Sequence, residues 1–402
     1  MSQRTLRPPL SACSMSARAD LPPNVVELLN KASLRAPEPA AASREAKEEW
    51  DGQRLPLPGF DLASFGFGGR WQEVGASFVL EPPKGVLMRG IVHFLGGAFI
   101  GAAPHIGYRA MLDAVADEGF VIVATPYDLQ FDYIDLCQGV LARSEAALLA
   151  MGTKYPGAPV FGLGHSCGAL LHTILASAFD TLPPRRAYAL LSFNSKPASE
   201  SIPQFEELVA PVSSAVMDQG EGASRARLGI QQAIEEVQRR TDELAGSAVA
   251  PRAVGRELLP LAWQGFKVLE QLPSLLQQVA DGTREFLPSP PEVRELVRGR
   301  FQAEGGALLV RFKEDSIDES PDLAEVLRSV GGGEEWGKDR VQLVDLPGTH
   351  VTPLTQDLFP STPLDSFDPF LPLRLVARQE LLRDVYAVSD EVVRFFDAEL
   401  SK

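Results

Sequence analysis

A Gly-His-Ser-Cys-Gly pentapeptide at positions 164–168 constrains the fold more than any other feature of the chain. A strand-like apolar run at residues 158–163 precedes it, and a helix-like apolar run at residues 168–177 follows it. A Gly-x-Ser-x-Gly pattern in this context is typical of a nucleophile elbow, a sharp strand-to-helix turn that exposes a serine. Small neighbours suit the turn because its backbone is strained and the helix passes close to the strand. The sequence therefore predicts Ser166 as a nucleophile, with the Cys167 amide facing a developing oxyanion.

A serine hydroxyl needs a base to remove its proton, and the downstream sequence offers an acid and a histidine after strands. Residues 307–312 form a strand-like run followed by Asp315, and residues 341–346 form another followed by His350. The order Ser166, Asp315, His350 is that of α/β-hydrolases, and it differs from the orders of chymotrypsin-like and subtilisin-like enzymes. The sequence therefore predicts an α/β fold of the α/β-hydrolase type with these three residues as a catalytic triad.

Some of these positions allow another interpretation. Asp318 and Glu314 share the loop of Asp315, so Asp318 stays open as the acid, and a merely solvated acidic turn is the alternative. A loop histidine without a catalytic role is the alternative for His350. We expect the other four histidines to shape loops or pack in the core: His93, His105, His165 and His172.

A glycine-containing loop after an earlier strand, at residues 90–99, is the candidate for a second oxyanion donor. It resembles the His-Gly-rich loop of esterases, although two apolar residues separate His93 from the glycines. The pattern leaves open which amide of residues 96–99 points inward, and it favours Gly97 or Ala98.

The glycines around Ser166 also permit a dinucleotide-binding interpretation. The spacing from Gly162 through Gly164 to Gly168 is one residue longer than in the Gly-x-Gly-x-x-Gly fingerprint. The next strand-like run, residues 187–193, is followed by Asn194 and a serine rather than by the acid that binds a ribose hydroxyl. This interpretation is disfavoured, and the chain carries no cofactor or metal motif.

Several motifs together resemble those of the domain of unknown function 1350 family. They are the segments at residues 93–104, 123–127, 164–166, 192–194 and 315–321. The resemblance covers Trp71 to His350, and it implies an α/β-hydrolase-like protein of a kind common in photosynthetic organisms and often directed to plastids. It implies no particular substrate. The chain departs from the family pattern at Ser195, where an asparagine is expected, and at Cys167, a place often filled by leucine.

The length of 402 residues fits one large domain with extensions. We expect a tail at residues 1–50 and a hydrolase domain at residues 70–402. A helical insertion at about residues 198–300 is expected to form a cap, because apolar residues there recur at helical spacing. The alternative is that this apolar stripe packs on the sheet. Ahead of the insertion we expect strands at 76–80, 85–94 and 120–124, and helices at 106–118 and 133–151.

The N-terminal nineteen residues carry three arginines and no acid before Asp20, which is typical of an organelle transit peptide. We therefore expect a plastid location, with a plain disordered tail and a cytoplasmic protein as the alternative. Residues 90–108 are uncharged, but they are rich in glycine and interrupted by histidine and proline, so no transmembrane segment is expected.

A net charge of −15 disfavours nucleic acid and anionic membrane surfaces as partners. Cys13, Cys137 and Cys167 have no metal-ligand spacing and form no paired framework, which favours a reducing compartment. The sequence thus predicts a cofactor-free serine hydrolase that acts on a small-molecule or lipid substrate through an ester, thioester or acyl bond. The alternative is a catalytically silent hydrolase-fold protein that binds or scaffolds.

Overall fold

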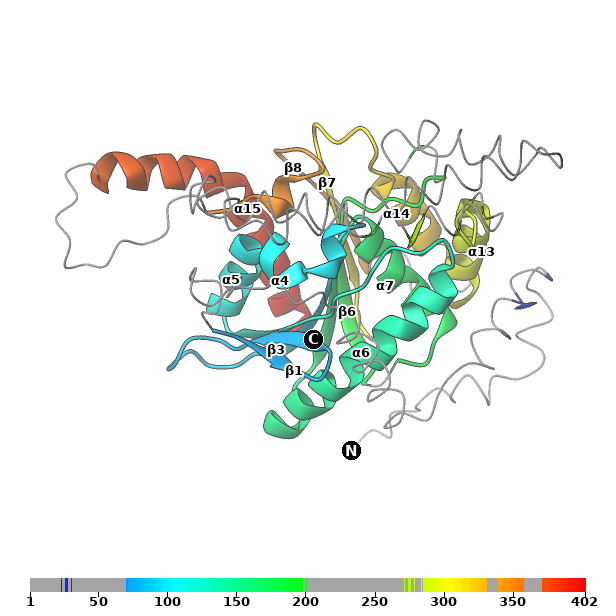
Figure 1. Cartoon of the computed structure of the whole chain (residues 1–402), viewed down its shortest axis with the longest axis horizontal. Helices are drawn as coiled ribbons and strands as arrows, with labels where there is room; N and C mark the ends of the chain where they lie inside the picture. Colours follow the sequence, from blue (N-terminus) through cyan, green and yellow to red (C-terminus); the bar gives the residue numbers. More distant parts are fainter. Residues whose placement is uncertain are drawn as a thin grey trace, which may run out of the picture.

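The computed structural model of the chain (Figure 1) describes residues 70–181, 183–197, 285–330, 339–357 and 371–402. It also describes the single residues 23, 26, 27, 30, 200, 271, 274, 275, 278 and 283. The predicted transit peptide and most of the predicted cap lie outside the described residues, so both stay predictions.

A mostly parallel sheet lies at the centre of the described chain. Its eight strands follow the order β1-β2-β4-β3-β5-β6-β7-β8. They are β1 (Trp71–Val74), β2 (Ser77–Leu80), β3 (Gly90–Leu95), β4 (Phe120–Ala124), β5 (Val160–His165), β6 (Arg185–Leu191), β7 (Ala307–Phe312) and β8 (Val341–Leu346). β2 runs antiparallel to β1 and to β4, and every other pair is parallel. Parallel neighbours need crossover connections, which place helices on both faces of the sheet.

The helices form two layers around this sheet (Figure 1). They are α4 (Pro104–Gly107), α5 (Arg109–Asp117), α6 (Tyr133–Lys154), α7 (Cys167–Ala178), α13 (Pro290–Arg300), α14 (Ser320–Arg328) and α15 (Leu371–Leu400), with 3₁₀ turns η3 (Ile100–Ala102) and η5 (Thr352–Leu354). α5 and α15 cover one face, and α6, α7, α13 and α14 cover the other. Residues alternate between the two cores along β4: Phe120 and Ile122 face α5 and α15, whereas Val121 and Val123 face α6.

The sequence predicted three strands residue for residue, at 120–124, 307–312 and 341–346. The strand predicted at 85–94 was wrong at residues 85–89, which form a loop before β3. Gly85 has φ of 92° there, and the Leu87 side chain is 83% exposed, so this apolar run does not enter the core. The helix predicted at 106–118 is divided at Tyr108, where α4 ends and α5 begins.

Residues 290–300, at the end of the predicted insertion, form helix α13. A capping box starts this helix: the Ser289 hydroxyl and amide both donate to the Glu292 carboxylate, at 2.7 and 2.8 Å. α13 packs against α7 and α14 and so belongs to the layer that covers the sheet.

The strand order, the mixed pairing at β2 and the two helical layers make this an α/β-hydrolase fold, as the sequence predicted. The three predicted triad residues follow β5, β7 and β8, at the carboxyl edge of the sheet. Ligands of open α/β sheets bind at this edge. In the part of the chain that the structure describes, no helix is long and apolar enough to cross a membrane.

Candidate active site

The turn between β5 and α7 has the strained geometry of a nucleophile elbow. Ser166 has φ of 54° and ψ of −120°, which a non-glycine residue adopts only under constraint. A Cβ atom on Gly164 would lie 2.6 Å from the Ala169 amide nitrogen, and one on Gly168 would meet the carbonyl oxygens of Leu95 and Gly96. Both glycines are therefore required by close backbone approach, as the sequence pattern predicted.

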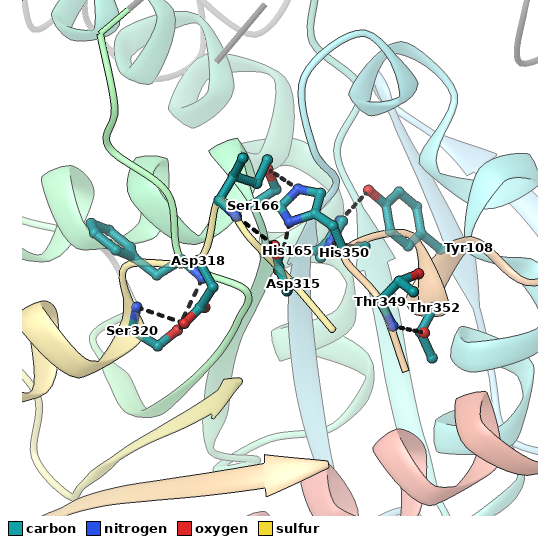
Figure 2. A network of polar contacts seen from close by, with 11 residues as sticks. Tyr108, His165, Ser166, Asp315, Asp318, Ser320, Thr349, His350 and Thr352 are labelled. Atoms are coloured by element: carbon teal, nitrogen blue, oxygen red, sulfur yellow. Dashed lines mark hydrogen bonds and ion pairs between the residues drawn. The ribbon is translucent and has the colours of Figure 1, made fainter. Parts of the chain in front are cut away.

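Ser166, His350 and Asp315 lie in one chain of hydrogen bonds (Figure 2). His350 Nδ1 lies 2.8 Å from Asp315 Oδ2, and His350 Nε2 lies 2.9 Å from Ser166 Oγ. An ionised carboxylate only accepts hydrogen bonds, so Nδ1 carries the proton and Nε2 accepts from the serine hydroxyl. This is the arrangement in which a histidine can remove the serine proton. Their catalytic role stays a prediction.

Backbone bonds beyond the ends of β7 and β8 bring the acid and the histidine together. The Lys313 amide donates to the Leu346 carbonyl and the Glu314 amide donates to the Gly348 carbonyl, both at 3.0 Å. Gly348 turns the chain at φ of 114°, and the Thr349 amide then donates to Thr352 Oγ1 at 2.9 Å. The two loops are thus held mainly by main-chain contacts.

Asp315, rather than Asp318, contacts His350. The Asp315 side chain is fully buried in the contact. Burial disfavours its ionised form, but contacts that include His350 and the Ile317 amide together outweigh burial, so the pKa of Asp315 is lowered and its carboxylate stays charged. Asp318 instead accepts from the amide and hydroxyl of Ser320, and burial raises its pKa to about 6. Of the two aspartates in this loop, Asp315 therefore contacts the histidine, and Asp318 accepts hydrogen bonds at the start of α14.

Tyr108 and His165 link the glycine loop to the backbone of His350 (Figure 2). His165 Nε2 lies 2.8 Å from the His350 carbonyl oxygen, which only accepts, so this nitrogen carries the proton. His165 Nδ1 then accepts from the Tyr108 hydroxyl at 2.8 Å, and that hydroxyl accepts from the Gly97 amide at 2.6 Å. Burial lowers the pKa of His165 to about 3, so the ring is neutral. Tyr108 belongs to no recognisable motif in the sequence, where it lies between Gly107 and Arg109, so its part in the site is visible only in the fold.

The candidate oxyanion donors differ in what their amides contact. The Gly97 amide is bonded to Tyr108, so the structure gives this predicted donor another partner. A Cβ atom on Gly97 would lie 3.3 Å from Ser166 Cβ, which places the loop directly against the nucleophile. Among the described residues, no hydrogen-bond partner is assigned to the amides of Ala98 or Cys167. These two amides are therefore the better candidates.

The Cys167 thiol lies next to the nucleophile but is not itself nucleophilic. It is buried, and burial raises its pKa to about 12, although the hydroxyls of Tyr127 and Tyr133 oppose the shift. A neutral, buried thiol is inert. Cys167 thus packs as a small apolar side chain, as the sequence predicted.

His93 and His172 form a separate buried cluster between the sheet and α7. The His172 ring donates from Nε2 to the carbonyls of His93 and Leu163, both at 3.1 Å. His93 Nδ1 accepts from Arg185 at 3.0 Å. Burial, reinforced by the Arg185 charge, lowers the pKa of His172 to about 3 and that of His93 well below 6.5. These histidines are structural.

Solved structures similar to the chain include three hydrolytic proteins. The first is the thioesterase domain from the curacin biosynthetic pathway, with 13% identity, a TM-score of 0.37, and coverage of 78% of this chain and 98% of that one. The second is a lipase in its open form, with 14% identity, a TM-score of 0.43, and coverage of 83% and 99%. The third is the enol-lactonase from Burkholderia xenovorans LB400, with 12% identity, a TM-score of 0.36, and coverage of 70% and 93%.

A family model matches most of the described chain, over residues 70–235 and 244–398. The match includes every element of the sheet and all three residues of the Ser166, Asp315 and His350 cluster. No curated protein matches the chain. The chain belongs to the family described as protein of unknown function (DUF1350), as the resemblance of its motifs indicated.

Proposed function

We propose that this protein is a serine hydrolase that cleaves an ester, thioester or lipid acyl bond. The observation that carries the proposal is the pair of contacts made by His350, at 2.9 Å to Ser166 Oγ and 2.8 Å to Asp315. The strained elbow that carries Ser166, at the carboxyl edge of the sheet, supports the proposal further.

In the acylation half, Ser166 Oγ attacks the substrate carbonyl carbon while His350 Nε2 takes the hydroxyl proton. The charged Asp315 stabilises the imidazolium that forms. Negative charge develops on the carbonyl oxygen, and the amides of Cys167 and Ala98 are the proposed donors to it. The tetrahedral intermediate then collapses, and His350 gives its proton to the departing alcohol or thiol, which leaves an acyl group on Ser166.

In the deacylation half, water replaces the leaving group. His350 Nε2 removes a proton from the water as its oxygen attacks the acyl carbon, and a second tetrahedral intermediate forms at the same amides. Collapse returns the proton to Ser166 Oγ and releases the carboxylic acid. Every proton movement uses the protein's own residues and water.

The first test is labelling of the purified protein with a fluorophosphonate probe, which reports an activated serine without knowledge of the substrate. We expect labelling of the wild type and none of Ser166→Ala, because the probe forms its bond with Ser166 Oγ. Asp315→Asn should lower the labelling rate by about 10⁴, since the wrong histidine tautomer is then favoured. Asp318→Asn is the matched control and should label at nearly the wild-type rate.

A folded wild-type protein that does not label would reject the hydrolase proposal and favour the alternative, a catalytically silent protein of the same fold. If the protein labels, hydrolysis of p-nitrophenyl esters and acyl thioesters of increasing chain length identifies the bond and the acyl group. Ser166→Ala serves as the blank in each assay.

We also propose that residues 1–50 direct the protein to plastids, on the basis of the arginines and the lack of acids before Asp20. Fusion of these residues to a fluorescent protein in plant cells tests the proposal. Plastid fluorescence is expected, and fluorescence that stays in the cytoplasm would contradict it.

A further inference from the structure

The glycine loop contains a strained turn directly after Ala98, one of the two proposed oxyanion donors. Phe99 has φ of 62° and ψ of −55°, and the Ile100 amide donates to the Ala98 carbonyl at 2.7 Å. This is a γ-turn of the rare, positive-φ kind. A strained turn persists only where its surroundings hold it, so its contacts show what holds it here.

Gln271 holds this turn from a distant part of the sequence. Its Nε2 group donates to the Phe99 carbonyl at 2.7 Å, and its Oε1 atom accepts from the Leu129 amide at 3.0 Å. The Gln271 side chain is 4% exposed, so neither bond competes with bulk water. The buried amide group of Gln271 therefore joins the glycine loop to the segment after β4.

The γ-turn at Phe99 also fixes the peptide unit between Gly97 and Ala98, which carries the Ala98 amide. The Gly101 amide, which follows the turn, donates to the Gly97 carbonyl at 2.7 Å. In a trans peptide the carbonyl of Gly97 and the amide hydrogen of Ala98 point in opposite directions. The bond to Gly101 thus sets the direction of the Ala98 amide, and it depends on the turn at Phe99.

We propose that Gln271 is a positioning residue for the oxyanion loop and that it thereby sets the reactivity of Ser166. This inference rests on the proposed hydrolase function. Gln271 touches no reacting atom: it holds the Phe99 carbonyl, which keeps Gly101 against Gly97 and the Ala98 amide directed at the oxyanion. Loss of the bond allows Phe99 to relax toward negative φ and turns that amide away.

Gln278 provides a matched control. Residues 271 and 278 are both helical. Gln278 Oε1 accepts from the Phe131 amide at 3.1 Å, and its Nε2 group donates to the Ser274 carbonyl at 3.4 Å. It therefore makes the same kind of contact with the segment after β4, but its bonds do not go to Phe99.

The test compares Gln271→Glu with Gln278→Glu. Each variant keeps the oxygen that accepts from Leu129 or Phe131, and each loses the amide donor. Removal of a whole oxyanion donor costs about 10²–10³ in rate, so misdirection of one donor should slow fluorophosphonate labelling of Ser166 roughly tenfold or more. We expect this loss in Gln271→Glu, with kcat for a p-nitrophenyl ester lowered more than KM is raised. Gln278→Glu should label within about twofold of the wild type.

Hydrogen exchange separates failure of this inference from failure of the proposed function. In a Ser166→Ala background, the peptide that covers residues 96–104 should exchange faster in Gln271→Glu than in Gln278→Glu, because the bonds of Ile100 and Gly101 loosen. Equal exchange overturns the inference whether or not the wild type labels. Faster exchange with unchanged labelling of Gln271→Glu, in a wild type that labels, overturns the positioning role and leaves the hydrolase proposal standing.

Discussion

The nucleophile elbow and the glycine loop both hold a non-glycine residue at positive φ, but they are held in different ways. Ser166, at 54°, is held by closely packed main chain: Gly164 lets β5 and α7 approach, and Gly168 lets α7 approach the end of β3. Phe99, at 62°, is held by the side chain of Gln271, which lies 172 positions further along the chain. Strain in the elbow is thus stabilised by main-chain packing, and strain in the loop is stabilised by a side-chain contact.

This difference explains why one half of the site is visible in the sequence and the other is not. Close packing of main chain requires glycine at fixed positions beside the serine, so it produces a short pattern, Gly-x-Ser-x-Gly. A side-chain contact requires only that one polar side chain reach a carbonyl in the folded protein, and a single glutamine among leucines forms no recognisable pattern. Substitutions in the two regions should therefore differ in what they damage.

The largest effect on stability is expected at the elbow, from Gly168→Ala. The added Cβ atom meets backbone oxygens of Leu95 and Gly96, which cannot move without distorting β3. We expect a loss of about 3 kcal/mol, the upper end for overpacking. In α6, a Cβ atom on Gly152 meets nothing within 4 Å, so Gly152→Ala should gain about 0.5–1 kcal/mol. Urea unfolding of both variants measures the contrast, and similar values would show that the close approach of β3 does not exclude a side chain at position 168.

A smaller effect, divided between stability and activity, is expected from Tyr108→Phe, between α4 and α5, whose hydroxyl contacts the glycine loop. The change removes the hydroxyl that joins the Gly97 amide to His165, which leaves a buried donor and acceptor unpaired. We expect a loss of about 1–3 kcal/mol in stability. Ser166 labelling should also slow, since the loop and the His350 backbone lose their link.

Tyr188→Phe is the control for this change. Tyr188 is equally buried, but it packs against His172 and Phe301, beneath α7. If both phenylalanine variants label at the same rate, the Tyr108 hydroxyl has no special part in the site.

The sequence predicted the elements that have a strong local signature. The strands at 120–124, 307–312 and 341–346, the elbow and the juxtaposition of Ser166, Asp315 and His350 all follow from apolar runs and from residues placed at strand ends. It could not predict that Tyr108 would take the Gly97 amide, or that Asp318 would bond to Ser320, because those choices depend on loop packing. The predicted strand at 85–94 was too long because an apolar residue such as Leu87 does not reveal its exposure.

A pH-dependent effect of intermediate size is expected from two buried histidines, His165 in the elbow and His172 in the separate cluster between the sheet and α7. Burial lowers the pKa values of His165 and His172 from 6.5 to about 3, so the unfolded chain binds more protons between these limits. Each histidine should therefore destabilise the fold by about 1.4 kcal/mol per unit as the pH falls below 6.5. Asp318 acts in the opposite sense, because its pKa is raised from 3.8 to about 6.

A difference measurement isolates one histidine from these opposing contributions. The free energy of unfolding of His172→Gln, relative to the wild type, should rise as the pH is lowered from 6.5 to 5, by about 1.4 kcal/mol per unit. His165→Gln should show the same slope, although His165 lies in the elbow, directly before Ser166. Parallel stability curves for the wild type and His172→Gln would mean that His172 binds its proton equally well in the folded and the unfolded protein.

The smallest effect is expected from the ion pair between the strands that carry the acid and the histidine. Arg311 on β7 and Asp345 on β8 lie opposite each other and bond at 2.7 and 2.9 Å, but both side chains are more than 40% exposed. Exposed pairs contribute little to stability, so a double-mutant cycle with Arg311→Gln and Asp345→Asn should give a weak coupling that falls at high salt. Ser166 labelling should be unchanged, because main-chain bonds join these two loops. A slower rate in either variant would show instead that side-chain charges help to align Asp315 with His350, and the acid and histidine loops would then depend on tertiary side-chain contacts as the glycine loop does.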